Sequence, residues 1–386
     1  MRETLRMQAV QSPVIPIVAD LIRANPGTIS LGQGVSYYGP PPQVREAVDG
    51  FFADPMNHRY QAVHGIPELL DLIESKLVAE NNISLDNRRI VVTAGANMGF
   101  MNAVLAITDP GDEIILLCPY YFNYDMAIAI AGCRAVVVNT DENYQPQLDA
   151  IESAITNRTR AIVTISPNNP TGAVYDEATL RSINRLCRER GLYHISDEAY
   201  ENFVYDGAEH FSSGLIDNSA GHTISLYSLS KAYGFASWRI GYMVIPEILF
   251  ERVRKIQDTN LICPPVISQH AAAAALRVGS DYCREKLTAI SGVRKLVIDQ
   301  LKPLEPRVHV PTARGAFYFL IRVDTSLLPM QAVERLVANH KVAVIPGDTF
   351  GVDDGCYLRI AYGSLEKATV EEGMSRLVEG LKIITE

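Results

Sequence analysis

Short apolar runs alternate with helical stretches through the middle of the chain, and this alternation constrains the fold more than any other feature. Seven runs rich in β-branched residues predict strands at 90–93, 113–118, 135–139, 161–165, 192–196, 223–228 and 240–245. Helical spacing falls between them, at 97–108, 124–131, 147–156 and 176–190. Continuous apolar strands separated by helices indicate a mostly parallel sheet with both faces covered. We therefore predict an α/β fold built on a mostly parallel, mixed seven-stranded sheet.

The last third of the chain has a different pattern. Short strands are predicted in the stretches VHV, GAFYFLIRV, VAVIPG and YLRIAYG, with amphipathic helices at PMQAVERLVANH and ATVEEGMSRLVEGLKII. This pattern predicts a smaller α+β domain. The 386 residues also exceed what one hydrophobic core usually supports. We predict a large domain at 40–275 and a small domain in which the N-terminal arm 1–39 joins 276–386.

The amino-acid composition limits the kinds of binding partner that this chain can have. A net charge of −9 and a pI near 5.5 argue against a surface for nucleic acid or acidic membranes. The first residues lack the apolar core and cleavage site of a signal peptide, and no apolar run reaches membrane-spanning length. Six cysteines without a CxxC pair fit reduced thiols in a cytoplasmic protein. Small molecules are the expected partners.

Residues that follow the strands are the candidate ligand-binding residues, because ligands of parallel sheets bind beyond the carboxyl ends of the strands. Lys231 follows the run 223–228, and a lysine at the end of a buried strand is either solvated or chemically used. The turn Gly95, Ala96, Asn97 can present backbone N–H groups and a helix dipole to an anion. Many α/β loops contain such a turn, so it is weak evidence alone.

Other strand ends carry polar and aromatic side chains. Tyr121 lies in the run CPYYFNY, whose rings either stack on a planar ligand or pack in the core. Asn169 either starts a turn or donates to a ligand oxygen. Asp197 either caps a helix or holds a protonated heterocyclic nitrogen. Arg239 adds a cation for a phosphate. Each piece is ambiguous alone.

Together these strand ends supply a phosphate cradle, a stacking ring, an oxygen donor, a partner for a ring nitrogen and a nucleophilic amine. Pyridoxal phosphate (PLP) requires this set, because it is a planar pyridine with a phosphate, a phenolic oxygen and an aldehyde. The sequence also resembles the class I/II aminotransferases of the aspartate aminotransferase fold type I. The resemblance runs from ISLGQG to YLRIAYG, nearly the whole chain.

The resemblance implies a role for each matching residue. SLSKAYGFASWRIGY is similar to the family's lysine motif, which implies Lys231 as the Schiff-base lysine and Ser228 and Arg239 as phosphate ligands. TAGAN looks like the family's phosphate cradle, with Gly95, Ala96 and Asn97. Lys231 would also be the base that moves the substrate's α-proton.

Three further motifs assign the ring contacts and the catalytic partners. SPNNPTG resembles the family's NPTG turn, implying Asn169 on the phenolic oxygen and beside the substrate. SDEAY implies Asp197 on the ring nitrogen and Tyr200 on the phenolic oxygen, both as catalytic residues with Lys231. Tyr121 falls where the family places its stacking aromatic ring.

The resemblance also implies a homodimer and a substrate clamp. RYQAVHGIPEL is similar to the segment whose tyrosine, here Tyr60, reaches the phosphate in the neighbouring subunit. YLRIAYG matches the family's late arginine, so Arg359 would hold the substrate carboxylate with help from the backbone at Gly34. Two positions depart from the pattern: Ser237 replaces a glycine, and Asn97 replaces a lysine found in some aspartate-specific relatives.

The predicted activity is transfer of an α-amino group between an L-amino acid and a 2-oxoacid. Carbon–sulfur lyases and cyclopropane-forming synthases share the same cofactor anchor and are the alternative, since fold likeness does not fix the reaction. A non-catalytic PLP-binding sensor is a third reading, but the arm before Ile29 has no room for a DNA-binding segment. Tyr37, Tyr38 and the turn 261–264 are expected to line an apolar or amphipathic side-chain pocket. With no clear second arginine for a dicarboxylate, this favours neutral or aromatic amino acids, or a broad range.

Overall fold

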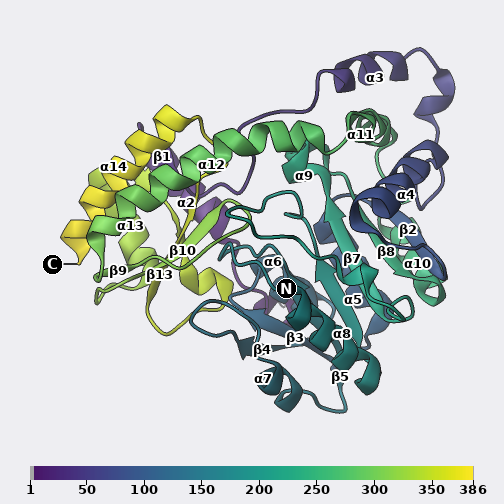
Figure 1. Cartoon of the computed structure of the whole chain (residues 1–386), viewed down its shortest axis with the longest axis horizontal. Coiled ribbons are helices and arrows are strands. Elements are labelled where there is room, and N and C mark those ends of the chain that lie inside the picture. Colours follow the sequence, from purple (N-terminus) through teal and green to yellow (C-terminus); the bar gives the residue numbers. More distant parts are fainter. Residues whose placement is uncertain (1–3, 386) are drawn as a thin grey trace.

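A seven-stranded sheet forms the centre of the larger part of the molecule in the computed structural model, which describes residues 4–385 (Figure 1). The spatial order is β2-β8-β7-β6-β5-β3-β4, and every strand except β8 runs in the same direction. The strands are β2 (Arg88–Thr93), β3 (Glu113–Cys118), β4 (Arg134–Asn139), β5 (Thr159–Ile165), β6 (Tyr193–Asp197), β7 (Thr223–Ser228) and β8 (Gly241–Pro246). The predicted fold class is confirmed, strand by strand.

Both faces of this sheet are covered by helices, which explains the continuous apolar strands. In β3, Ile114 and Leu116 point into one core cluster while Ile115 and Leu117 point into the other. The helices of this part are α3 (Gln43–Phe51), α4 (Pro67–Asn81), α5 (Ala96–Ile107), α6 (Phe122–Ile130), α7 (Leu148–Ser153), α8 (Glu177–Arg190), α10 (Phe250–Leu261) and α11 (Val266–Val278). The sequence did not predict α10. In that helix Val253 and Gln257 are buried and Phe250 and Ile256 are partly buried against the core, so its apolar face is short and lies among charged and polar residues.

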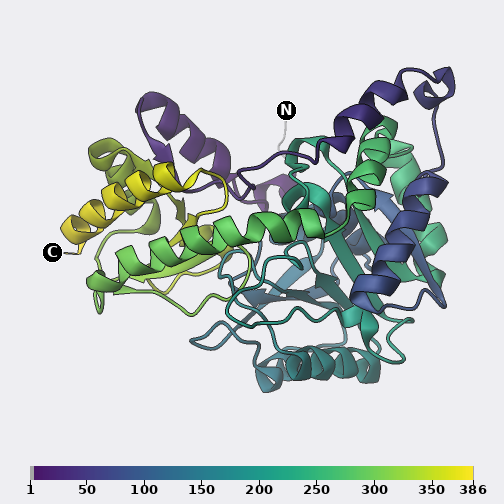
Figure 2. The same cartoon turned by 45° about the horizontal axis from the view of Figure 1, so that its top comes forward.

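The smaller part contains an antiparallel sheet of order β12-β13-β10-β9. Its strands are β9 (Val308–His309), β10 (Tyr318–Val323), β12 (Ile345–Pro346) and β13 (Cys356–Ala361), packed with α13 (Pro329–His340) and α14 (Lys367–Ile384). The long helix α12 (Asp281–Leu301) runs from the larger part to the smaller one (Figure 2). Among residues 4–385, no helix is long and apolar enough to cross a membrane.

The N-terminal arm returns to the smaller part. Helix α2 (Val14–Ala24) contacts α13 and β12, and the two-residue strand β1 (Ile29–Ser30) pairs in parallel with β11 (Val342–Ala343). These contacts support grouping the arm with the C-terminal region. The domain limits at 39/40 and 275/276 remain a prediction.

The carboxyl ends of the central strands lie in register. Asp197, the last residue of β6, is opposite Ile165 of β5 and Leu226 of β7. Asn169 lies in the segment that follows β5, Tyr200 in the segment that follows β6, and Lys231 in the segment that follows β7. One edge of the sheet therefore presents most of the predicted site, and β10 and β13 of the smaller part lie against it.

Candidate active site

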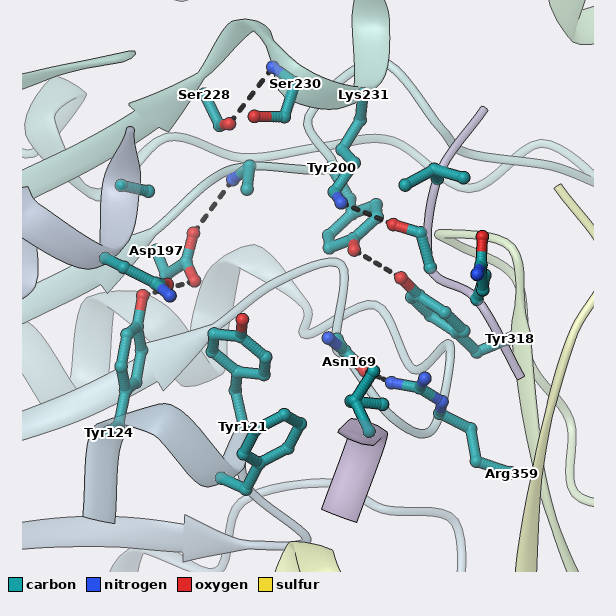
Figure 3. Close-up of a pocket in the computed structure, with 18 of the residues that line it drawn as sticks. Tyr121, Tyr124, Asn169, Asp197, Tyr200, Ser228, Ser230, Lys231, Tyr318 and Arg359 are labelled. Carbon is teal, nitrogen blue, oxygen red and sulfur yellow. Dashed lines mark hydrogen bonds between the residues drawn. The ribbon is translucent and has the colours of Figure 1, made fainter. Parts of the chain in front are cut away.

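Lys231 lies at the end of an interior strand, in the short helix α9 (Leu229–Ala232) that follows β7 (Figure 3). Ser228 caps this helix, and its Oγ accepts from the backbone N–H of Ser230 at 3.2 Å. The Lys231 Nζ points into a cavity and donates to the carbonyl oxygen of Gly34. Burial, followed by the charges of Arg359 and Arg239, lowers the pKa of Lys231 to about 8. The amine is therefore partly neutral near neutral pH.

Asp197 is a buried carboxylate on the opposite side of the cavity. The hydroxyl of Tyr124 donates to its Oδ2 at 2.5 Å, and the backbone N–H of Ala199 donates to its Oδ1 at 3.0 Å (Figure 3). Burial raises the pKa of Asp197 to about 6, although both hydrogen bonds oppose the rise. Asp197 is ionised at pH 7, and can hold a cationic ring nitrogen.

The first turn of α5 forms an anion cradle. Gly95 is the residue before this helix and has φ +83°, in the left-handed region. A Cβ at this position would overlap the guanidinium of Arg239, so glycine allows the cation to approach the helix start. Arg239 is fixed there by donating to Ala236 O at 2.8 Å and to Ala94 O at 3.4 Å. Helix N–H groups and an arginine suit a phosphate.

Arg359 comes from β13 of the smaller part and is 3% exposed. Its Nη1 donates to Asn169 Oδ1 at 2.9 Å and its Nη2 donates to Gly32 O at 2.7 Å. Its Nε is buried without a hydrogen-bond partner. An unsatisfied N–H on a buried guanidinium indicates room for an anionic ligand, since such groups are normally paired.

A cavity of about 310 Å³ joins these groups. Of the predicted site residues it is lined by Gly34, Ala96, Asn97, Tyr121, Asn169, Asp197, Tyr200, Ser228, Lys231, Arg239 and Arg359. Gly95 does not line the cavity itself, but it is the N-cap of α5, whose first residues Ala96 and Asn97 do. The structure thus brings together residues from seven separate segments at one place.

Tyr60 lies elsewhere. It follows the short helix η1 (Pro55–His58), in the segment that projects from the larger part beyond α3, and it is 78% exposed (Figure 1). It does not line the cavity of its own chain. Its expected contact in a neighbouring subunit stays a prediction.

The expected side-chain pocket differs from the observed one. Tyr37, Tyr38 and the turn 261–264 do not line the cavity. The hydroxyl of Tyr38 instead donates to the carbonyl oxygens of Lys231 and Ala232, at 3.1 and 3.2 Å. Tyr38 therefore stabilises α9 through its backbone.

The cavity also contains residues that sequence reasoning did not select. They are Ile15, Gln33, Val35, Phe122, Ala199, Ser230 and Tyr318. Tyr124, in the run CPYYFNY, is expected to stack or pack through its ring, whereas the structure shows its hydroxyl donating to Asp197. Ile15 belongs to the arm helix α2, and nothing in its sequence context indicates a ligand. Tyr318 lies in the apolar run GAFYFLIRV, where an aromatic ring reads as core. Gln33 had a signal, since it stands beside Gly34 in ISLGQG.

The donor set fits PLP on observations of this chain alone. A glycine-capped helix start with an arginine suits the phosphate, a buried carboxylate suits the ring nitrogen, and an amine of lowered pKa suits covalent attachment. Fold and cavity together define a PLP-dependent enzyme of fold type I.

Comparison with known proteins gives the family. Residues 26–377 match the family model "Aminotransferase class I and II". An aspartate aminotransferase of Pyrococcus abyssi is 33% identical, covering 98% of this chain and 97% of the relative. An aromatic aminotransferase of Arabidopsis thaliana is 31% identical, covering 98% and 95%. The structure of a Thermus thermophilus aspartate aminotransferase double mutant aligns with a TM-score of 0.89 at 32% identity, covering 98% and 100%.

The chain belongs to the class I and II aminotransferase family. It is a PLP-dependent aminotransferase, and the predicted fold, cofactor and reaction are confirmed.

Proposed function

We propose that this chain transfers the α-amino group between L-amino acids with neutral or aromatic side chains and 2-oxoacids, using Lys231, Asp197 and Arg359. The observation that carries the proposal is the meeting of these three side chains, from α9, β6 and β13, at one cavity. When bound, PLP supplies an electrophilic carbon for the amino group and a ring that withdraws electrons. Lys231 would hold it covalently.

The other residues of the cavity would each contact a different part of PLP. The cradle Gly95–Asn97, Ser228 and Arg239 would hold the phosphate, and Tyr121 would lie against the ring. Asn169 and Tyr200 would donate to the phenolic oxygen. Both are buried, so these hydrogen bonds would form away from competing water.

Proton transfer falls to Lys231. With a pKa of about 8, roughly a quarter of the amine is neutral at pH 7.5 and can accept the α-proton of the substrate. Asp197 would stay ionised and keep the positive charge on the ring nitrogen, because a buried cation needs a close carboxylate.

Arg359 would orient the substrate through its carboxylate. The guanidinium is buried and already fixed by Asn169 and Gly32, and its free Nε–H leaves a donor for the ligand. A planar fork binds a carboxylate in two places, which lysine cannot do. Arg359→Lys should therefore raise KM for both the amino acid and the oxoacid by about 10- to 100-fold. An unchanged KM in steady-state assays would remove Arg359 from substrate binding.

The substrate side chain would contact Ile15, Gln33 and Val35. Among the residues that line the cavity in the described part of the chain, the cations are Lys231, Arg239 and Arg359, each with a role above. Among these described lining residues, no further cation is therefore left for a second carboxylate. The relatives named above include both aspartate and aromatic aminotransferases.

A panel of amino donors with 2-oxoglutarate tests this substrate class. We expect kcat/KM for phenylalanine, tyrosine or leucine to exceed that for aspartate by about tenfold or more, since an unpaired carboxylate would be desolvated in the cavity. A preference for aspartate would overturn the proposed class but not the reaction.

A homodimer with shared sites is the proposed assembly. Tyr60, Phe52 and Met56 are 78%, 63% and 51% exposed on the projecting α3–η1 segment, a large apolar surface for a monomer. If Tyr60 serves the neighbour's site, mixing Tyr60→Ala and Lys231→Ala subunits restores one intact site in each mixed dimer. Activity should return to about a quarter of wild type at equal mixing. No recovery after verified subunit exchange would reject the shared site.

We also propose a cytoplasmic location. All six cysteines are free, as expected for thiols in a reducing compartment. Cell fractionation tests this directly, and recovery of the protein in an oxidising compartment would contradict it.

A further inference from the structure

Tyr318 contacts three residues of the candidate site that are far apart in the sequence, namely Arg359, Tyr200 and Gly34. It begins β10 in the smaller part and is 1% exposed (Figure 3). Strands β10 and β13 are antiparallel, with Tyr318 opposite Ala361 and Leu320 opposite Arg359. Tyr318 and Arg359 are therefore diagonal neighbours on one face of the sheet, within reach of long side chains.

The ring of Tyr318 supports the guanidinium of Arg359. The guanidinium carbon lies 4.7 Å from the centre of the Tyr318 ring and 5.0 Å from that of Phe350. Burial lowers the pKa of Arg359, yet an arginine stays charged, so the two ring faces stabilise a buried cation. The orientation of Arg359 thus depends on Tyr318 as well as on hydrogen bonds.

The hydroxyl of Tyr318 lies 2.5 Å from the hydroxyl of Tyr200, which belongs to the larger part. Gly34 makes room for it, because a Cβ at position 34 would overlap the Tyr318 hydroxyl oxygen. The carbonyl of the same Gly34 accepts from Lys231. A single hydroxyl therefore contacts both the Tyr200 side chain and the segment that receives the lysine.

We infer that Tyr318 is a positioning residue: its hydroxyl directs the proton of Tyr200 towards the cofactor's phenolic oxygen, and its ring holds Arg359 for the substrate carboxylate. The inference rests on the roles proposed above for Tyr200 and Arg359. If Tyr318 donates to Tyr200, the Tyr200 proton is left for the ligand, and the two hydrogen bonds polarise each other.

Both hydroxyls carry a proton at neutral pH, as this arrangement requires. Burial raises the pKa of Tyr318 to about 12, and burial together with Tyr318 raises that of Tyr200 well above its usual value. A stronger donor at the phenolic oxygen of bound PLP would draw electron density away from the Lys231 nitrogen that holds the cofactor, so that nitrogen would bind its proton less tightly.

The test compares Tyr318→Phe, Tyr318→Leu and Tyr200→Phe in the cofactor-loaded protein. Tyr318→Phe removes only the hydroxyl, so the pH midpoint of the cofactor's visible absorption change should rise by about 0.3–1 pH unit. Tyr200→Phe should shift it further in the same direction. KM values of Tyr318→Phe should stay within about twofold of wild type, because the ring remains under Arg359.

Tyr318→Leu removes the ring as well. It should show the same midpoint shift and an additional rise of about threefold or more in KM for both substrates, as Arg359 loses a cation–π partner. Tyr362→Phe is the matched control, since Tyr362 is equally buried in the smaller part but its hydroxyl contacts Ala316 O, outside the cavity. That variant should leave the midpoint and KM unchanged. Circular dichroism and cofactor stoichiometry verify that each variant folds and loads.

Two results would overturn the inference. If Tyr200→Phe moves the midpoint and Tyr318→Phe does not, Tyr318 only fills space and the proposed role of Tyr200 survives. If neither substitution moves it, the role of Tyr200 falls together with the inference.

Discussion

Asp197 and Glu198 are consecutive buried carboxylates, yet their pKa values move in opposite directions. Asp197 is 5% exposed and its pKa is raised to about 6 by burial. Glu198 is 1% exposed, and burial alone would also raise its pKa. Hydrogen bonds and charge from His210, with Ser212 and Lys76, reverse this and lower it. The supply of partners, rather than burial, separates a reactive carboxylate from a structural one.

The partners of Glu198 form a continuous network. His210 Nε2 lies 3.0 Å from its Oε2, and Ser212 Oγ donates to the same oxygen at 2.6 Å. Asn81 Nδ2 donates to Ser212 Oγ at 2.8 Å and to Glu201 at 2.8 Å. Such a network stabilises the fold, although the Nδ1 of His210 is buried without a hydrogen-bond partner. On the other side of the strand end, Lys231 has one backbone acceptor and Arg359 keeps an unpaired Nε–H.

The largest contrast should come from two partly buried lysines, Lys231 and Lys76. Lys231→Ala should lower turnover by about 10⁴-fold or more, because it removes both the covalent attachment and the base. Lys76→Ala is the matched control: Lys76 pairs with Glu201 at 2.6 Å, outside the cavity, so turnover should survive. Stopped-flow half-reactions and visible spectra measure both. Normal turnover and an unchanged cofactor spectrum in Lys231→Ala would refute its assignment.

Asp197→Asn should lower kcat by about 10²- to 10⁴-fold, since a neutral amide cannot keep the ring nitrogen protonated. The cofactor-free protein should not lose stability, because the native carboxylate is buried at a cost that its raised pKa reflects. Steady-state kinetics and thermal unfolding of the cofactor-free protein provide the two readouts. A fully active Asp197→Asn variant would place the ring nitrogen elsewhere.

Below pH 7, protonation of Asp197 should weaken cofactor binding, whereas Glu198, whose pKa is lowered, should stay ionised. With a pKa of about 6, Asp197 is half ionised at pH 6 and mostly protonated at pH 5, so cofactor binding to the cofactor-free protein should weaken about fivefold between these pH values. In Asp197→Asn this part of the pH dependence should disappear, while the titration of the cofactor's own phosphate remains. Fluorescence titration over this pH range distinguishes the two. Identical profiles for both proteins would contradict the assignment.

The smallest effect on activity should come from Glu198→Gln. The amide keeps some hydrogen bonds but loses the charge beside His210, so the free energy of unfolding should fall by about 2 kcal/mol. Turnover should stay within about threefold of wild type. Urea unfolding measures the stability of this variant, and steady-state kinetics measures its turnover. A large loss of turnover with unchanged stability would show that Glu198 takes part in catalysis, as proposed for Asp197.

Sequence reasoning reached the strands and the residues directly after them. Lys231, Asp197 and Asn169 follow β-branched apolar runs that predict buried parallel strands, so their meeting at one edge of the sheet was predictable. Contacts between segments that are distant in the sequence were not predictable. Nothing in GAFYFLIRV separates the cavity-lining Tyr318 from its neighbour Phe319, because both read as core side chains of a strand. Ile15 reaches the cavity only because the arm folds back onto the smaller part.

The pairing of β1 with β11 also sets the order in which the molecule can be completed. Ile29 lies beside Val342, more than 300 residues later in the chain. At about 5–20 residues per second, a ribosome needs roughly 15–60 s to make the intervening segment. During that time the N-terminal arm has no strand to pair with, while the larger part can already fold. The arm therefore stays without its strand partner until residues 342 and 343 have been made, and only then can this part of the fold close.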